Sequence, residues 1–303
     1  MRVLVIGGTG FISGAAATRL AAEGHDLACF HRGERAGELP RGATRILGDR
    51  GEIERHAEAL RAWNPDVVVD CVAFREADAR ALVETFRGVA RRLVVLSSVD
   101  VYRAYGRFTR AEPGPPDPTP LDEDAPLRAS RFPRRRWATP DDVMWDYEKI
   151  LVERAVSRDP DLPCVVLRLP MVYGKGDHAR RRVASYLDRM RARQSIELDA
   201  ALAAWRWTRC FVDDVAEAIA LAAARATESR VYNVGEPFAL TELEWARAIG
   251  RAAAWEGDVV TRAIGLEDDY GHDLVLDTSR IQRELGWTAR TPLHEALART
   301  INP

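Results

Sequence analysis

The sequence predicts an α/β protein whose core is a doubly wound parallel sheet. Three observations lead to this expectation. The chain opens with a strand, a glycine-rich turn, a helix and a second strand within residues 1–32. Short apolar runs then alternate with helical patterns as far as residue 234, an order that favours parallel strands joined by crossover helices. The remaining residues are mainly helical in pattern, so we expect a Rossmann-type sheet with a smaller C-terminal lobe.

The opening turn has the form of a phosphate-binding site. Arg2–Ile6 is a run of strand-forming residues, and Gly7-Gly8-Thr9-Gly10 separates it from apolar residues at helical spacing over Phe11–Glu23. Asp26–Phe30 follows as the second strand. A helix N-terminus presents free N–H groups and the positive end of its dipole, and glycine lets a phosphate approach the backbone closely. We therefore expect a dinucleotide pyrophosphate at this turn.

The end of the second strand predicts which dinucleotide is bound. In NAD-selective sites an acidic residue at this place accepts hydrogen bonds from the ribose, whereas arginine suits the 2′-phosphate of NADP. Here the strand is followed by His31 and Arg32, and the first carboxylate is Glu34. The pattern favours NADP over NAD. The alternative is that Arg32 is a solvated residue at a strand end.

The later strands and helices continue the alternation. The predicted strands are 43–47, 67–73, 93–98, 164–170, 205–212 and 231–234, and the predicted helices are 52–63, 77–89, 142–157, 180–193, 215–225, 243–254, 278–285 and 293–300. Ligands of such sheets bind at the carboxyl ends of the strands. Asp49 would there accept a hydrogen bond from an adenine amino group, or it would cap the next helix. Cys71, Val72 and Ala73 would let the cofactor lie against the end of their strand.

A long irregular loop is expected over 103–142, because this stretch is rich in proline and lies between a strand and a helix. Long loops in compact domains are usually lids or binding loops. Its arginines at 134–136 would either meet an anionic substrate or lie in solvent, and the sequence leaves both readings open.

The length of 303 residues suits one large α/β domain with an appended lobe. We expect residues 1–172, together with about 205–234, to form the dinucleotide-binding domain. The lobe that binds the substrate would comprise about 173–204 and 235–303.

Composition weighs against several other classes of protein. The formal net charge of −2 disfavours nucleic acid as the main partner. No apolar run approaches a membrane span, and the first strand begins at residue 2, which leaves no room for a signal peptide. We therefore expect a cytoplasmic protein. The four cysteines are far apart, so we expect buried free thiols and no metal site.

Lysine occurs only at Lys149 and Lys175, in a chain that otherwise uses arginine. Retaining an amine at two places indicates a need for a mobile ammonium group with an adjustable pKa. The alternative is that the two lysines are leftovers without a special role. Ser97 and Ser98 end the strand 93–98 and are candidates for orienting a carbonyl. The alternative for the two serines is that they are ordinary cap or turn residues.

Seven motifs in order resemble those of the extended short-chain dehydrogenase/reductases, and more narrowly the NAD(P)-dependent epimerase/dehydratase group acting on nucleotide sugars. They are Gly7-Gly8-Thr9-Gly10-Phe11-Ile12, Gly48-Asp49-Arg50, Ser97-Ser98-Val99-Asp100-Val101-Tyr102, Lys149, Arg168-Leu169-Pro170-Met171-Val172-Tyr173-Gly174, Asp213-Asp214-Val215-Ala216 and Tyr232-Asn233-Val234-Gly235. The resemblance runs nearly end to end, and it implies the fold and the cofactor more specifically than the reaction.

The resemblance implies a catalytic Ser/Thr, Tyr and Lys, in which the cation lowers the pKa of the phenol that moves the proton. Ser98 and Lys149 match this pattern, but the tyrosine expected four residues before the lysine is Trp145, whose indole cannot act as an acid near neutral pH. On a regular helix Tyr147 would face about 200° away from Lys149, unless the helix starts late or is distorted. The proton would then pass through Tyr147, Asp100 or a water. The alternative role of Lys149 is an i,i+4 pair with Glu153.

A second departure concerns the substrate. The family commonly places an arginine that contacts a diphosphate seven residues before the second Asp of its Asp-Asp pair, and that position is Trp207 here. Arg209 lies two residues later, on the same face of the predicted strand. We expect substrate contacts at Trp145, Tyr173 and Arg209. The expected cofactor contacts are Gly7, Thr9, Gly10, Phe11, Ile12, His31, Arg32, Asp49, Arg50, Cys71, Val72, Ala73, Ser97, Lys149, Leu169 and Val172.

Two functional hypotheses follow. The first is an NADP-binding oxidoreductase or epimerase that acts on a hydroxyl or carbonyl of a small polar substrate such as a nucleotide sugar. The second is a protein of the same fold that has lost this chemistry with Trp145 and instead senses NADP(H), or binds RNA or another partner. The family often pairs through two long helices, so a homodimer through 77–89 and 142–157 is also expected.

Overall fold

A computed structural model describes residues 1–34, 38–178 and 181–302. Its main sheet has seven parallel strands in the order β10-β6-β5-β4-β1-β2-β3. The strands are β1 (Arg2–Ile6), β2 (Asp26–His31), β3 (Thr44–Leu47), β4 (Val67–Asp70), β5 (Arg92–Ser98), β6 (Cys164–Leu169) and β10 (Arg230–Asn233). The strand order reverses between β1 and β4, so the predicted doubly wound Rossmann-type sheet is confirmed.

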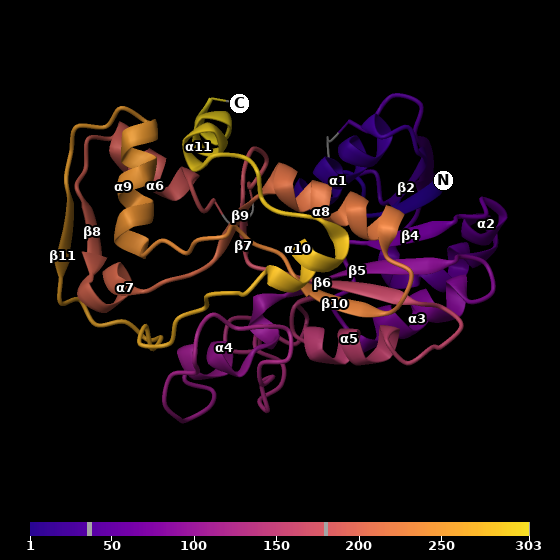
Figure 1. The fold of residues 1–303 in the computed structure, drawn as a ribbon, viewed down its shortest axis with the longest axis horizontal. Coiled ribbons are helices and arrows are strands. Elements are labelled where there is room, and N and C mark those ends of the chain that lie inside the picture. Colours follow the sequence, from indigo (N-terminus) through magenta and orange to yellow (C-terminus); the bar gives the residue numbers. More distant parts are fainter. Residues whose placement is uncertain (35–37, 179–180, 303) are drawn as a thin grey trace.

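Helices cover both faces of this sheet (Figure 1). The helices of this part are α1 (Phe11–Ala22), η1 (Arg50–His56), α2 (Ala57–Ala62), α3 (Glu76–Phe86), α5 (Lys149–Val156), α8 (Val212–Arg225) and α10 (Ser279–Leu285). The helices α1 and α8 pack together on one face, and α3 and α5 pack together on the other. Each face has its own apolar core, built around alternate residues of the central strands such as Val3 and Val5 on one side and Leu4 and Ile6 on the other.

A smaller lobe lies beside the sheet at the left of Figure 1. It consists of α6 (Ala184–Arg191), β8 (Ile196–Asp199), α7 (Ala200–Ala204), α9 (Glu242–Ala252) and β11 (Val259–Arg262). The strands β8 and β11 pair in parallel. A second pair, β7 (Met171–Tyr173) and β9 (Arg209–Phe211), lies between this lobe and the main sheet, and α11 (Leu293–Ile301) ends the chain. The exact division into two domains stays a prediction.

Several predicted elements have other bounds in the structure. The loop predicted over 103–142 begins with the helix α4 (Arg103–Phe108), which follows the turn η2 (Val99–Val101). Tyr102, Tyr105 and Phe108 are buried there, so apolar packing stabilises a helix in a proline-rich segment. The strand predicted over 205–212 is reduced to β9, because Trp205 ends α7 and Val212 begins α8. The helix predicted over 180–193 begins at Ala184, and Arg180 lies outside the described residues.

The helix predicted to begin near Asp142 begins only at Lys149, and this difference matters most for the site. Residues 141–146 form turns. Glu148 is the N-cap of α5 in an extended conformation (φ −155°, ψ 95°), and its carboxylate accepts a hydrogen bond from the Ile150 N–H. Tyr147 therefore precedes the helix, and this late start is the condition under which Tyr147 was expected not to face away from Lys149.

Candidate active site

The glycine turn lies between β1 and α1, at the centre of the sheet. Gly7 has φ +104°, a backbone conformation that residues other than glycine rarely adopt. A Cβ at Gly8 would lie only 2.6 Å from the Cys29 Sγ, so β2 packs directly against the turn. Ser13, in the third place of the glycine pattern, accepts from Gly10 N and donates to Gly7 O, each over 3.0 Å. Its small side chain thus fixes the shape of the turn.

This turn fits the pyrophosphate of a dinucleotide. The helix α1 has twelve residues, its N-cap is Gly10, and its first turn contains no acidic side chain that would neutralise the positive end of the dipole. Thr9, Phe11 and Ile12 complete the turn and the helix start, as the sequence predicted. These observations support the predicted cofactor contacts, although the contacts themselves stay predictions.

The end of β2 is basic, with one carboxylate close by. His31 is buried, and burial together with the charge of Arg45 lowers the pKa of its imidazole. The Arg32 side chain is 54% exposed and lies 3.3 Å from the Glu34 carboxylate, measured from Nη2 to Oε2. Arg32 is thus accessible to a 2′-phosphate, which would have to compete with Glu34.

Asp49 and Arg50 both have structural partners. Asp49 caps η1 by accepting from Gly51 N over 2.7 Å, as the helix-cap alternative predicted, and its exposed side chain is also open to an adenine. Arg50 forms a 2.8 Å ion pair with the fully buried Asp70 and donates to the Asp78 carbonyl. Arg50 therefore stabilises the ends of β4 and α3, and a role in cofactor binding stays a prediction.

The residues after β4 and β6 line the same end of the sheet. The strand β4 ends at Asp70, so Cys71, Val72 and Ala73 leave the sheet, and a Cβ at Gly7 would lie 3.3 Å from the Val72 Cγ1. Leu169 pairs with Ser98 across β5 and β6, and Val172 lies in β7. Of the cysteines, Cys29, Cys164 and Cys210 are buried free thiols as expected, whereas Cys71 is half-buried.

Lys149 is buried, with its ammonium group at the junction of two strands. Its Nζ donates to the Ala73 carbonyl over 2.6 Å and to the Leu96 carbonyl over 2.7 Å. Burial lowers the pKa of this ammonium to about 8, against the opposing charges of Asp70 and Asp100. The alternative pair with Glu153 is not formed, because the Glu153 carboxylate binds Arg168 instead.

We expect the low pKa of Lys149 to appear as a pH-dependent stability. The unfolded chain keeps this proton up to a pKa of about 10.4 and the folded chain releases it at about 8. Between these values the unfolded state binds more protons, so stability rises with pH, by roughly 3 kcal/mol in total. The difference between the free energies of unfolding of the wild type and of Lys149→Met should therefore shift in favour of the wild type as the pH rises from about 7 to 10.5. Lys175→Met is the control, and parallel curves for wild type and Lys149→Met would contradict the prediction.

Tyr147, Ser98, Asp100 and Lys149 come together at the carboxyl end of β5. The Tyr147 hydroxyl donates to Asp100 Oδ2 over 2.9 Å, and the ring centroid lies 5.9 Å from Lys149 Nζ. The Ser98 hydroxyl accepts from Asp100 N over 3.2 Å, so it caps η2, and its side chain also interacts with the Tyr147 hydroxyl. The structure thus brings the four predicted catalytic residues into one cluster.

The surroundings of Tyr147 keep its phenol protonated. Burial, followed by the charge of Asp100, raises its pKa well above the usual value, and Arg134 and Ser98 oppose this shift. The Arg134 guanidinium lies 5.2 Å from the ring centroid, and its Nη2 lies 3.3 Å from Asp100 Oδ2. Asp100 Oδ1 and Arg134 Nε are both buried without a hydrogen-bond partner in the described part of the chain. Two polar atoms beside the phenol therefore lack a hydrogen-bond partner among the described residues.

Trp145 lies in the turn before α5 and contacts the arginine-rich loop. Its carbonyl accepts from Arg135 Nε over 3.2 Å, and the Arg135 guanidinium lies 4.9 Å from its ring centroid. The side chain is half-buried. A substrate contact from Trp145 stays a prediction.

A buried polar network behind the serines was not predicted. Glu153 accepts from the Ser97 hydroxyl over 2.5 Å and pairs with Arg168, whose Nη1 donates to the Tyr102 hydroxyl over 3.0 Å. The Tyr102 hydroxyl in turn donates to Asn233 Oδ1 over 2.6 Å. Arg168, a charged residue in an otherwise apolar strand, was the available sequence signal, since a buried charge requires a partner. The network joins β5, α5, β6 and β10 at the end of the sheet that carries the site.

The other predicted substrate residues are engaged within the protein. Tyr173 is fully buried and donates to Glu236 Oε1 over 2.8 Å. Arg209 is 2% exposed and pairs with Glu242, and its Nη1 donates to the Leu240 carbonyl. The half-buried Trp207 packs on Trp205 at a centroid distance of 4.8 Å. Substrate contacts from Tyr173 and Arg209 stay predictions.

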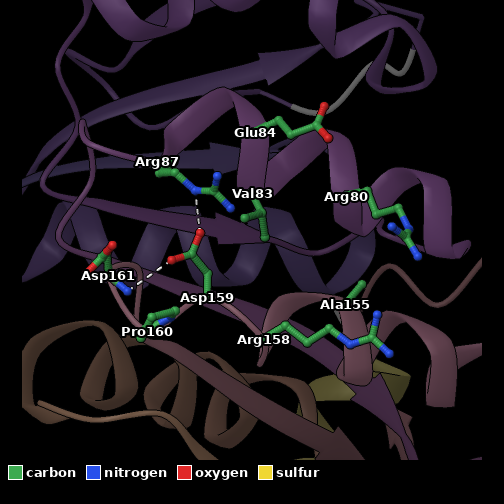
Figure 2. Close-up of a pocket in the computed structure, with 9 residues that line it drawn as sticks. All are labelled: Arg80, Val83, Glu84, Arg87, Ala155, Arg158, Asp159, Pro160 and Asp161. Carbon is green, nitrogen blue, oxygen red and sulfur yellow. Dashed lines mark hydrogen bonds and ion pairs between the residues drawn. The ribbon is translucent and has the colours of Figure 1, made fainter.

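A hollow of about 410 Å³ lies between α3 and α5, away from this cluster (Figure 2). None of the predicted site residues lines it, and Figure 2 shows Arg87 paired across it with Asp159. Its lining residues are Arg80, Val83, Glu84, Arg87, Ala155, Arg158, Asp159, Pro160 and Asp161. The two helices are those expected to form a homodimer, which stays a prediction.

Within residues 1–34, 38–178 and 181–302, no set of three or more His, Cys, Asp or Glu side chains is arranged to hold a metal ion. None of the helices there combines the length and apolar content needed to cross a bilayer.

The sheet and its glycine turn define a dinucleotide-binding protein of the extended short-chain dehydrogenase/reductase class. A model of the NAD dependent epimerase/dehydratase family matches residues 3–235, and the chain belongs to this family. The expected class, an enzyme of the epimerase/dehydratase or reductase type, agrees with this family, and the activity itself stays a prediction. The cofactor is confirmed as NAD(P), whereas the choice of NADP stays a prediction.

Individual relatives are distant. The chain is 28% identical over 233 residues to a 2′-dehydrokanamycin reductase of Streptomyces kanamyceticus. The matched region covers 73% of this chain but only 57% of the relative. A UDP-glucose 4-epimerase of Thermotoga maritima, solved with UDP-glucose, has a TM-score of 0.77 at 20% identity over 99% of this chain and 97% of that one. MoeE5, solved with UDP-glucuronic acid and NAD, has a TM-score of 0.75 at 23% identity over 99% and 98%. The two structures establish the shared fold.

Proposed function

We propose that this protein is an NAD(P)-dependent oxidoreductase that acts on a carbonyl or hydroxyl of a small polar substrate, with Tyr147 as the proton-transfer residue in place of Trp145. One observation carries the proposal. The Tyr147 hydroxyl, the Ser98 hydroxyl and the Lys149 ammonium lie in one buried cluster at the carboxyl end of β5, despite the missing tyrosine of the family pattern.

The cofactor would be held by the glycine turn and the ends of the neighbouring strands. Gly7, Gly10 and the start of α1 would bind its pyrophosphate, His31 and Arg32 would lie at the adenosine end, and Lys149 would bind the nicotinamide ribose. A bound nicotinamide supplies or accepts a hydride. The support for this arrangement is the glycine conformation and the absence of a carboxylate in the first turn of α1.

The residues of the chain favour the reductive direction. Tyr147 is held as a neutral phenol beside Asp100, so its proton is available to an oxygen that gains negative charge. Ser98 would orient that oxygen by a hydrogen bond. Asp100 Oδ1 and Arg134 Nε, which have no hydrogen-bond partner among the described residues, would bind polar groups next to the reacting carbon. The name of the Streptomyces relative, a reductase, agrees with this direction.

The substrate we propose is a polar, hydroxyl-bearing molecule such as a nucleotide sugar. In its favour, similar folds have been solved with UDP-glucose and with UDP-glucuronic acid. The position that the family gives to a diphosphate-binding arginine holds Trp207, so a sugar without a nucleotide belongs in the same screen.

The decisive experiment is a cofactor titration followed by a substrate screen. Purified protein is denatured to identify any released nucleotide, and the stripped protein is titrated with NADPH and NADH by fluorescence. Oxidation of NADPH is then followed with ketoses, keto-sugars and 4-keto nucleotide sugars. Turnover of one of them supports the proposal. Tight NADPH binding without any turnover would favour the sensing protein, and no binding of either nucleotide would overturn the proposal.

Arg32 is expected to select the 2′-phosphate. Arg32→Ala should weaken NADPH binding by about 10- to 100-fold, because one charge-assisted contact is worth about 1.5–3 kcal/mol, and should change NADH binding little. Removing the competing carboxylate in Glu34→Gln should tighten NADPH binding. Arg251→Ala, on α9 of the other lobe, is the control. Equal weakening of both nucleotides by Arg32→Ala would exclude selection by this residue.

A further inference from the structure

A fully buried ion pair lies beside the catalytic cluster. The side chains of Arg128 and Glu148 are both 0% exposed, and Arg128 Nη2 donates to Glu148 Oε1 over 3.0 Å. The desolvation of two charges offsets much of the attraction between them. The presence of such an ion pair is therefore explained better by the segments that it holds in place than by a net contribution to the stability of the fold.

The pair joins three segments of backbone. On one side, Glu148 caps α5 through Ile150 N over 3.1 Å and accepts from Phe132 N over 2.7 Å. On the other side, Arg128 Nε donates to the Asp100 carbonyl and Nη1 donates to the Ser130 carbonyl over 2.6 Å. The Glu148 N–H also donates to the Phe74 carbonyl over 2.9 Å. The start of α5, the turn η2 and the loop at 128–132 are thus linked to one another.

These contacts determine the direction of the reacting side chains. Glu148 is held extended by its cap and by its bond to Phe74, and the side chains that flank an extended residue project to the same side. Tyr147 and Lys149 therefore point together toward the end of β5. Arg128 donates a hydrogen bond to the backbone carbonyl of Asp100, and the Asp100 carboxylate accepts a hydrogen bond from the Tyr147 hydroxyl.

We propose that Arg128 and Glu148 are positioning residues, which allow a tyrosine two residues before the lysine to take the place of one four residues before it. Because the cap starts the helix at Lys149, the large angle expected between the two side chains on a helix is replaced by a common direction. The proposal rests on the proposed function for the catalytic role of Tyr147. The claim that the ion pair positions the Tyr147 side chain is testable without any substrate.

The test is to replace the pair by two residues of similar volume, Arg128→Met with Glu148→Met. Exchanging a buried ion pair for apolar side chains is often neutral for stability, so the variant should fold. In protein labelled with ¹³C at the tyrosine ring, the Tyr147 resonance, assigned by its loss in Tyr147→Phe, should move toward that of a solvated phenol. Its titration should fall toward the ordinary pKa of about 10. With a substrate in hand, kcat should fall at least about tenfold while KM changes little.

Glu148→Gln is the second variant, in case the double variant does not fold. It keeps an acceptor for the Ile150 N–H but loses the charge that pairs with Arg128. We expect an intermediate shift of the Tyr147 resonance, smaller than that of the double variant. An unchanged resonance and an unchanged titration in either folded variant would overturn the proposal.

The matched control is the ion pair at the opposite end of α5. Arg87 and Asp159 pair near the hollow of Figure 2, and Arg87→Met with Asp159→Asn keeps an acceptor for the Asp161 N–H. This control should leave the Tyr147 resonance as in the wild type. Measuring the Tyr147 resonance requires no turnover. If the wild-type protein had no reductase activity, the proposed function would be refuted, and the resonance would still decide whether Arg128 and Glu148 position Tyr147.

Discussion

Tyr147→Phe should lower kcat by about 10²- to 10⁴-fold and leave the Kd for NADPH within about twofold, because general acid catalysis contributes a factor of this size. The phenyl ring can keep the contact with Phe74, and only the hydroxyl bonded to Asp100 is removed. The measurement is steady-state NADPH oxidation, combined with a fluorescence titration of the nucleotide. A loss of NADPH affinity equal to the loss of turnover would instead indicate that Tyr147 acts in binding.

The matched controls use position 145. Trp145→Phe should lower kcat much less than Tyr147→Phe, because the indole contacts Arg135 and carries no acidic hydroxyl, and loss of the predicted substrate contact should instead raise KM. Adding Trp145→Tyr to Tyr147→Phe should not restore activity, since residue 145 lies in a turn and not one helical turn before Lys149. Restoration by that double variant would show that the helix extends further toward the N-terminus in the working enzyme.

Arg168→Met should destabilise the folded protein by about 3–5 kcal/mol, because it removes one partner of a buried ion pair. Arg168 binds both oxygens of Glu153, at 3.0 and 2.8 Å, and also donates to Tyr102 and to the Glu123 carbonyl. Without it the Glu153 carboxylate keeps only the Ser97 hydroxyl among its side-chain partners in the described residues. The measurement is the free energy of unfolding in urea.

The control for this variant is an exposed ion pair on α3. Arg80 and Glu76 pair at an i,i+4 spacing with the arginine side chain 58% exposed, and Arg80→Ala should cost less than about 1 kcal/mol. An Arg168→Met protein as stable as Arg80→Ala would show that the network of Glu153 and Tyr102 is satisfied in another way.

The sheet and the cofactor turn could be predicted because their signals are local. A strand of β-branched residues followed by Gly7-Gly8-Thr9-Gly10 and an alanine-rich helix is typical of a dinucleotide-binding turn and of few other structures. The apolar runs of the central strands predict the rest of the sheet. Ser98 and Lys149 were singled out because they match positions of the family pattern and because lysine is scarce in this chain, and their catalytic roles stay predictions. The family match then agrees with the class expected from the motifs.

The position of Tyr147 could not be predicted because it depends on a distant residue. Asp141 and Asp142 have the sequence signature of a helix start, yet α5 starts at Lys149, where Glu148 can cap it and also pair with Arg128. That pairing is a tertiary contact between residues 20 apart in the chain. Local periodicity therefore placed Tyr147 on a helix that does not exist there.

The strands of the smaller lobe were missed for a related reason. Each of β8 and β11 has four residues and pairs only with the other, 63 residues away in the chain, as in Ile196 with Val259. Strands this short have little periodic signal of their own. Their pairing becomes visible only when the chain between them has folded.

The close packing of Gly8 against Cys29 has a consequence for how this sequence can vary among its relatives. A Cβ at position 8 would overlap the Cys29 sulfur, so the size of one residue limits the size of the other. Because such a Cβ would also lie only 2.7 Å from the Cys29 Cβ, any side chain at position 8 in an alignment of related chains should be accompanied by glycine at position 29. The two positions would covary as a pair although 21 residues separate them.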